Sequence, residues 1–141
     1  MVDITFTEVS KKMKEYNWPA FDAVVGIARG GIVPASLIAH QHQLELHLLQ
    51  VNYRDDANNP RYKTPILLSD TNPWDAISLD KKILLVDDVS VTGTTMNFVL
   101  DYFKNHQVIT FALKGKADHV LFHDIKSCVN WPWKVNKPKN E

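Results

Sequence analysis

The chain has 141 residues, 45% of them hydrophobic and 23% charged, and its sixteen basic residues balance its sixteen acidic ones. This size and mix are typical of one globular domain, and the balanced charge argues against nucleic acid as the main partner, because such binding needs clustered positive charge. The single cysteine, Cys128, excludes an internal disulfide. The sequence shows neither a basic-then-apolar leader nor a membrane-length apolar run, so we expect a cytoplasmic protein.

The first predicted element is a helix near the start of the chain. Thr5 and Glu8 have the spacing of a capping box, and Ile4 and Val9 are placed to form a hydrophobic staple around it. The helix would carry an apolar stripe and end at residues 17–19; the stripe consists of Phe6, Val9, Met13 and Tyr16.

Strands and helices then alternate along the chain. Apolar runs predict strands over 23–27, 46–52, 81–87 and 108–113, and helical spacing predicts helices from 32 to about 40 and over 92–105. A polar stretch over 54–65 interrupts this pattern, and the chain from 114 onward is expected to be short and irregular. The alternation predicts an α/β fold in a single domain of residues 1–141, with a twisted parallel sheet flanked by helices.

Residues 83–95 combine a buried strand, two carboxylates and a loop of hydroxyls. Four apolar residues precede Asp87 and Asp88, and the loop leads into a helix whose stripe consists of Met96, Val99, Leu100 and Phe103. Free N–H groups and the positive end of the helix dipole suit an anion such as phosphate. The neighbouring carboxylates suit the hydroxyls of an attached sugar or a divalent cation.

A second anion-binding loop follows the strand over 23–27. Gly30 and Gly31 allow backbone N–H groups to approach an anion closely, and Arg29 adds a positive fork. Taken alone, the same residues also fit a tight turn with a surface arginine.

Both segments resemble those of one enzyme family, whereas the patterns GxxxxGK[ST] and GxGxxG are absent. Residues 86–95, VDDVSVTGTT, resemble the signature with which type I phosphoribosyltransferases bind phosphoribosyl diphosphate (PRPP). Residues 24–39, VVGIARGGIVPASLIA, resemble the pyrophosphate loop of that family. The alternative for the first segment is a buried strand with solvated acids and an ordinary helix cap. The resemblance extends from about Phe21 to Trp133 and implies the type I phosphoribosyltransferase fold with a small C-terminal hood.

PRPP is a ribose that carries a phosphate at one end and a diphosphate at the other, and the resemblance implies ligands for each part. The 5′-phosphate would be bound by Ser90, Val91, Thr92, Gly93, Thr94 and Thr95. The departing diphosphate would be bound by Ala28, Arg29, Gly30 and Gly31, with a cis peptide bond between Ala28 and Arg29. Asp87 and Asp88 would contact the ribose hydroxyls, with Asp88 also near Mg²⁺, so the catalytic residues would be Arg29, Asp87 and Asp88.

The resemblance also implies a mobile loop and a base pocket. The loop, at about 53–65, would begin with Asn52, Tyr53 and Arg54 and exclude water; a plain surface connection is the alternative. The hood would span about 114–141. In the branch that acts on 6-oxopurines, a lysine at the position of Lys114 binds the exocyclic oxygen of the base, although a lysine at a strand end is also simply solvated.

Residues 128–133, CVNWPW, resemble the W-x-x-x-P-W segment that lines the base in this branch, so Cys128 and the backbone of Val129 would contact it. Trp131 and Trp133 fit a hydrophobic core equally well. The basic residues at 134, 137 and 139 are expected to be solvated.

Two departures from the branch pattern bear on the acceptor. Val91 stands where an acid/base aspartate is usual, and Cys128 stands where an aromatic residue stacks on the base. The leading hypothesis is Mg²⁺-dependent transfer of phosphoribose from PRPP to xanthine, guanine or hypoxanthine in nucleotide salvage, with release of pyrophosphate. The alternatives are a phosphoribosyltransferase for another nucleobase and a non-catalytic PRPP or nucleotide sensor. The family further implies a homodimer.

Overall fold

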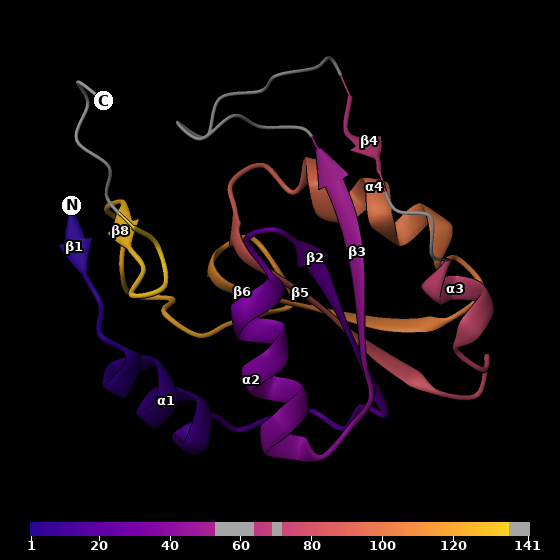
Figure 1. The fold of residues 1–141 in the computed structure, drawn as a ribbon, viewed down its shortest axis with the longest axis horizontal. Coiled ribbons are helices and arrows are strands. Elements are labelled where there is room, and N and C mark those ends of the chain that lie inside the picture. Colours follow the sequence, from indigo (N-terminus) through magenta and orange to yellow (C-terminus); the bar gives the residue numbers. More distant parts are fainter. Residues whose placement is uncertain (53–63, 69–71, 136–141) are drawn as a thin grey trace.

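The computed structural model describes residues 1–52, 64–68 and 72–135, and Figure 1 shows the arrangement of its helices and strands. The strands are β1 (Val2–Asp3), β2 (Ala23–Ala28), β3 (Leu46–Asn52), β4 (Ile66–Leu67), β5 (Lys82–Ser90), β6 (Gln107–Gly115), β7 (His119–Val120) and β8 (Val129–Asn130). The helices are α1 (Phe6–Glu15), α2 (Ile32–His42), α3 (Pro73–Ala76) and α4 (Thr94–Tyr102).

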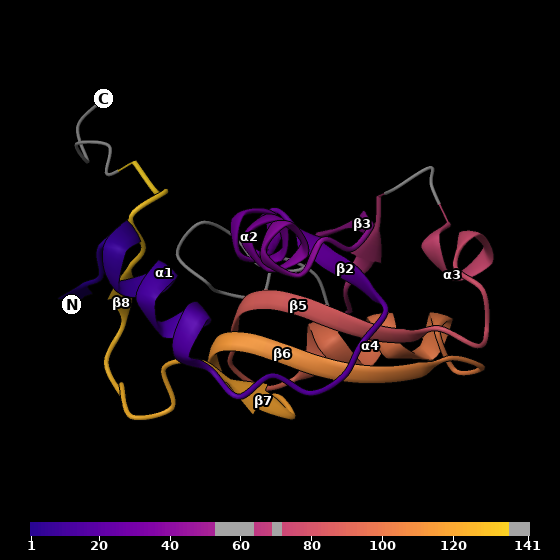
Figure 2. The same cartoon turned by 90° about the horizontal axis from the view of Figure 1, so that it is seen from below.

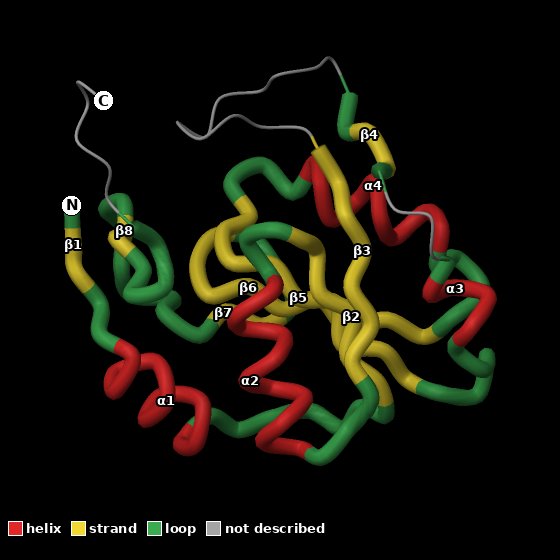
Figure 3. The backbone as a smooth tube through the Cα atoms, viewed as in Figure 1, coloured by secondary structure: helices red, strands yellow, loops and turns green. Residues whose placement is uncertain are grey.

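A central sheet organises these elements and confirms the predicted α/β class. Its strand order is β4-β3-β2-β5-β6-β7, and every pair is parallel except the antiparallel pair of β3 and β4. In Figure 2, α2 lies on one side of the sheet and α4 on the other. Figure 3 shows the strands crossing the centre of the molecule with the helices around them.

Alternating side chains of the central strands build two cores, one on each face of the sheet. Val24 and Leu84 face α2, whereas Val25 and Leu85 face α4. Because the central strands are covered on both faces, β2 and the stretches 83–86 of β5 and 111–113 of β6 are continuous runs of apolar residues and glycine. This double coverage holds the carboxyl ends of β2 and β5 in fixed positions.

The first helix forms as its sequence predicts, with one difference. The Glu8 N–H donates to Thr5 Oγ1 at 3.1 Å, and the staple residues Ile4 and Val9 are both buried. Phe6, predicted as part of the buried stripe, is exposed. Its ring instead lies at the edge of the helix, 6.2 Å from the ring of Trp133.

Several boundaries differ from the prediction because pairing between distant strands extends or adds elements. β5 continues through both carboxylates to Ser90, since residues 82–90 pair with β6 as far as Gly115. α4 is correspondingly shorter than the predicted helix over 92–105.

The segment after β6 is less irregular than predicted and ties the two ends of the chain together. Residues 129–130 form a parallel two-stranded sheet with β1, visible near the N-terminus in Figure 1. Phe122 and Trp131 enter the same core as Val9 and Met13 of α1. The C-terminal segment is therefore fixed against α1 and α2 rather than against α4.

Candidate active site

The site follows from the order of the strands. β2 and β5 are neighbours, but the chain leaves β2 toward α2 on one face of the sheet and leaves β5 toward α4 on the other. Loops that diverge in this way open a crevice at the carboxyl ends of parallel strands, where α/β proteins bind ligands. A cavity of about 150 Å³ lies here, lined by residues 27–30, residues 87–95 and Val51. The structure thus brings together both loops that the sequence singled out.

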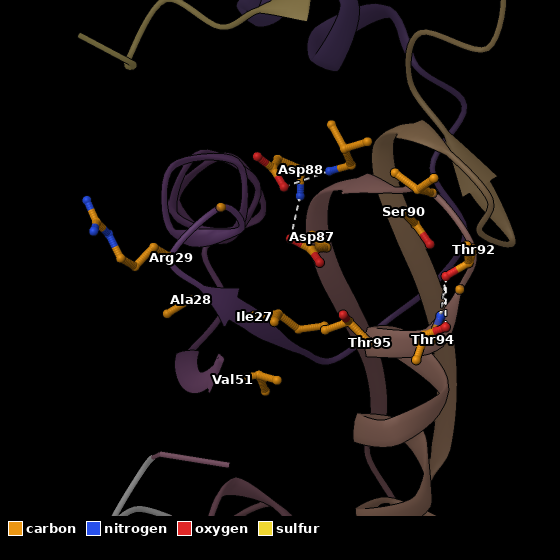
Figure 4. Close-up of a pocket in the computed structure, with 14 residues that line it drawn as sticks. Ile27, Ala28, Arg29, Val51, Asp87, Asp88, Ser90, Thr92, Thr94 and Thr95 are labelled. Carbon is orange, nitrogen blue, oxygen red and sulfur yellow. Dashed lines mark hydrogen bonds between the residues drawn. The ribbon is translucent and has the colours of Figure 1, made fainter. Parts of the chain in front are cut away.

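The two carboxylates stand at the centre of this cavity. Asp87 Oδ1 accepts a hydrogen bond from the Asp88 N–H at 2.8 Å, and Asp88 Oδ1 accepts one from the Val89 N–H at 2.7 Å. Figure 4 shows these bonds as dashed lines. Each carboxylate is therefore oriented by the backbone of the residue that follows it.

The two carboxylates differ in their surroundings. Asp87 is only 9% exposed, and burial raises the pKa of its carboxyl well above the ordinary range. The nearby charge of Asp88 raises the pKa of Asp87 further, whereas Lys134 acts in the opposite direction. A buried acid beside a second acid, in a cavity, is typical of functional sites.

The Arg-Gly-Gly loop contacts the carboxylates directly. The peptide bond between Ala28 and Arg29 is cis, as the family resemblance implied. A Cβ atom on Gly30 would lie 2.3 Å from Asp88 Oδ1, so only glycine fits there without movement. Gly31 does not line the cavity; a Cβ atom on it would lie 2.5 Å from the Val86 carbonyl oxygen. The loop is therefore packed against β5 with no room for side chains at these two positions.

The arginine of this loop is oriented differently from its neighbours. Arg29 is exposed and lines the cavity, but in Figure 4 its guanidinium points away from Asp87 and Asp88. It forms no ion pair with either carboxylate among the residues that the structure describes.

The loop before α4 has the features of an anion site. Gly93 has a φ of 84°, which brings the chain sharply into the helix, and it supplies no side-chain cap; the Thr94 N–H donates to Thr92 Oγ1 at 3.4 Å. The hydroxyls of Thr92 and Thr94 lie 2.8 Å apart, and Thr94 Oγ1 and Thr95 belong to the same cavity wall. Ser90 is buried, and its Oγ has no hydrogen-bond partner within the described part of the chain. The loop thus brings the Thr92 and Thr94 hydroxyls and the start of α4 to the cavity wall.

The sequence analysis missed one residue of the site, Lys134. Its Nζ lies 3.6 Å from Asp88 Oδ2, although the sequence pattern predicted only a solvated tail. The signal that could have found it is its position directly after the segment that resembles the base pocket. The other two basic residues of the tail, at 137 and 139, lie outside the described residues.

A family model for the phosphoribosyl transferase domain matches residues 5–139. The chain belongs to this family. The family predicted from the two loops is therefore confirmed.

Solved structures of the family are similar over nearly the whole chain. A purine phosphoribosyltransferase from Pyrococcus horikoshii is 22% identical with a TM-score of 0.70, covering 99% of this chain and 97% of that one. The xanthine-guanine-hypoxanthine phosphoribosyltransferase of Helicobacter pylori is 19% identical with a TM-score of 0.74, covering 95% and 94%. At these identities the likeness shows the shared fold.

One curated relative is named as a transcriptional regulator and not as a phosphoribosyltransferase. The transcriptional regulator GfcR of Methanosphaerula palustris is 30% identical over 92 residues, which make up 65% of this chain and 41% of the regulator. The chain thus spans about two fifths of the length of this relative.

The predicted base-binding residues of this phosphoribosyl transferase domain are not part of the cavity. Lys114 stands opposite Val89 in the pairing of β5 and β6, next to a residue that does line it. Cys128 is exposed, and its carbonyl accepts the Val2 N–H at 2.9 Å. Val129 pairs with Val2, and the alternation of a parallel ladder directs the Val129 carbonyl away from β1.

Both tryptophans of residues 128–133 pack in or against the hydrophobic core, and neither lines the cavity. Trp131 is 1% exposed and belongs to the core, where its ring lies 5.6 Å from that of Trp133, with which it is stacked at 1°. Of the predicted mobile loop, Asn52 ends β3 without lining the cavity, and Tyr53 and Arg54 lie outside the described residues.

The described residues offer neither a clustered metal site nor a membrane-spanning helix. They contain no group of three or more His, Cys, Asp or Glu side chains that could hold a metal ion. They also contain no helix with the length and apolar character that crossing a bilayer requires. His119, one of the histidines in the sequence, bonds instead to the Tyr16 hydroxyl at 2.7 Å.

Proposed function

We propose that this protein transfers the phosphoribosyl group of PRPP to a 6-oxopurine such as xanthine, guanine or hypoxanthine and releases pyrophosphate, with residues 1–141 acting as one domain. One observation carries the proposal: the Arg-Gly-Gly loop and the hydroxyl loop line the same cavity, with two carboxylates between them. A ligand with an anionic group at each end and a diol between them matches this order of residues.

The chemistry requires positioning rather than covalent catalysis. The bond between the anomeric carbon and the diphosphate oxygen breaks, a bond from a base nitrogen to that carbon forms, and the proton of that nitrogen passes to the departing diphosphate or to water. Residues 90–95 would hold the 5′-phosphate, and Asp87 and Asp88 would hold the ribose hydroxyls and stabilise positive charge on the sugar. Arg29 and the N–H groups of residues 30 and 31 would bind the departing diphosphate, which requires the Arg29 side chain to rotate toward the cavity.

The carboxylates also fit Mg²⁺, which prefers oxygen ligands and is usually held by one or two carboxylates together with substrate phosphates. Asp88 Oδ1 is engaged by a backbone N–H, so Oδ2 is the oxygen through which Asp88 would contact the ion. When bound, Mg²⁺ neutralises charge on the diphosphate.

A sensor that binds PRPP or a nucleotide without turnover is the second candidate. It is favoured by Val91, a side chain that moves no proton and lines the cavity where the family places an aspartate, and by the regulators among the curated relatives. A phosphoribosyltransferase for another nucleobase is the third, because the residues at 91 and 128 depart from the branch pattern.

Two measurements separate these candidates. The protein is mixed with Mg²⁺, PRPP and xanthine, guanine, hypoxanthine or a wider panel of bases, and pyrophosphate release is followed. Calorimetry measures PRPP binding in parallel, with Arg29→Ala as the test and Lys11→Ala, an exposed lysine on α1, as the matched control. Turnover with a 6-oxopurine supports the proposal, and binding without release from any acceptor supports the sensor. No PRPP binding, or no effect of Arg29→Ala, would reject both.

We further propose that the partner of the chain is a second copy. Leu46 and Leu48 share the α2 face of the sheet, and the pairing of β3 with β4 places Ile66 and Leu68 on this same face. These four side chains and Leu37 of α2 are each 37–48% exposed. A group of exposed apolar side chains of this kind is typical of an interface.

A further inference from the structure

Asp88 forms an ion pair with Lys134, a residue that lies 46 positions later in the sequence. One carboxylate oxygen, Oδ1, accepts the Val89 N–H, and the other, Oδ2, lies 3.6 Å from Lys134 Nζ. The Asp88 side chain is 13% exposed and lines the cavity, whereas that of Lys134 is 52% exposed and is not part of the lining. The ammonium therefore lies beside the carboxylate oxygen of Asp88 that does not accept the Val89 N–H.

The backbone before Lys134 is well anchored. The Lys134 N–H donates to the Trp131 carbonyl at 3.1 Å, which closes a turn over a fully buried indole. Trp131 in turn packs against Phe122 and stacks on Trp133. The position of Lys134 beside Asp88 thus depends on the core and not on a freely moving tail.

No other basic side chain of the described residues forms an ion pair with the two carboxylates. Arg29 points away from them in Figure 4. Asp87 and Asp88 repel each other when both are ionised, and Lys134 is the charge that offsets this repulsion in the ligand-free protein. A divalent cation at Asp88 Oδ2 would meet the ammonium at close range, and two positive charges this close repel.

We propose that Lys134 is a tethered competitor of the divalent cation at Asp88: its ammonium holds the place of the metal in the free protein and must leave when the metal and the phosphorylated sugar bind. The inference deepens the proposed function and rests on it for the identity of the ligand. It makes Lys134 a positioning residue, which sets how much metal is needed to load the site.

The first test measures metal binding alone, with Mn²⁺ as a paramagnetic probe and no sugar present. Wild type, Lys134→Ala, Lys134→Arg and Lys126→Ala are compared, the last as a control that removes an exposed lysine from the same segment. An exposed ion pair of this kind corresponds to a change of about two- to fivefold in affinity. Lys134→Ala should therefore bind Mn²⁺ about two- to fivefold more tightly than wild type, whereas Lys134→Arg and Lys126→Ala should match wild type.

Three results would overturn the inference. One is equal Mn²⁺ affinity of Lys134→Ala and Lys126→Ala, which would show only a general charge effect. Another is weaker binding in Lys134→Ala, which would make the ammonium a supporting ligand. The third is no Mn²⁺ binding by any variant, since removal of a competitor should expose the site.

The second test separates this inference from the proposed function. Calorimetry of PRPP with Mg²⁺ is carried out on the same variants, and circular dichroism confirms that each is folded. If Lys134→Ala gains Mn²⁺ affinity but no variant binds PRPP, the competition stands and the proposed function fails. If PRPP binds but the Mn²⁺ affinities are equal, the proposed function stands and the competition is wrong.

Discussion

Gly30→Ala tests the contact between the two loops most directly. The added Cβ would lie 2.3 Å from Asp88 Oδ1, 2.6 Å from Cγ and 2.7 Å from Oδ2, so it would overlap the whole carboxylate. The φ of Gly30 is outside the left-handed region, so alanine carries no backbone penalty there. A loss of stability on substitution is therefore assigned to the carboxylate contact, since the lower entropy of the unfolded chain with alanine acts in the opposite direction.

The size of the effect follows from the distances. Ordinary contacts of a Cβ atom begin at 3.4 Å, so the Arg-Gly-Gly loop and Asp88 would have to move apart by about 1 Å. Overpacking of this kind costs about 1–3 kcal/mol of folding free energy, and a 1 Å displacement of positioning groups costs about 100-fold in rate. We expect Gly30→Ala to be less stable by this amount and to lose about two orders of magnitude in turnover.

A double-mutant cycle with Asp88→Ala isolates the cause. Urea unfolding and PRPP calorimetry are measured for wild type, Gly30→Ala, Asp88→Ala and the double variant. Because Asp88→Ala removes the overlapping carboxylate, the second substitution should cost little further stability in that background. Equal costs of Gly30→Ala in both backgrounds would refute the reasoning, since the carboxylate would then not be the atom group that alanine meets.

Three further predictions concern stability and assembly. The pKa of Asp87 is raised in the folded chain, so folding takes up a proton and the free energy of unfolding falls as pH rises from about 4, the unfolded pKa, toward the folded pKa. Asp87→Asn should abolish this fall, leaving the variant more stable than wild type at neutral pH in urea unfolding from pH 5 to 8; an unchanged slope would show that Asp87 is not its source. Trp131→Ala should cost about 3–5 kcal/mol in urea unfolding because the indole is fully buried, and Trp133→Ala, at a partly buried ring, should cost less; equal losses would contradict the assignment of the core. Leu48→Glu should convert a dimer into a monomer in analytical ultracentrifugation, with Lys11→Glu as the control; a wild-type monomer, or a dimer in Leu48→Glu, would exclude this face as the interface.

Features of the fold and of the site that depend on residues close together in the sequence could be predicted from it. The capping contact of Thr5 with Glu8 spans three residues, and the strand-loop-helix units around residues 24–39 and 83–103 each show their own period of apolar residues. The cis peptide bond between Ala28 and Arg29 was implied by the family resemblance. The structure differs from the prediction at the end of β5. The carboxylates there suggested a loop, but pairing with β6 extends the strand to Ser90.

The two ligand loops could be predicted from the sequence alone, because periodicity, capping and loop composition express interactions within a few residues, and the family was implied by the resemblance of residues 24–39 and 86–95 to its motifs. The tertiary structure decided which distant segments meet: Gly30 with Asp88 in the crevice, Lys134 with Asp88, and, away from the crevice, Val2 with Val129. These contacts join segments far apart in the chain, and no local pattern reports them, since each depends on how the sheet, its crossing helices and the buried Trp131 orient their neighbours in space.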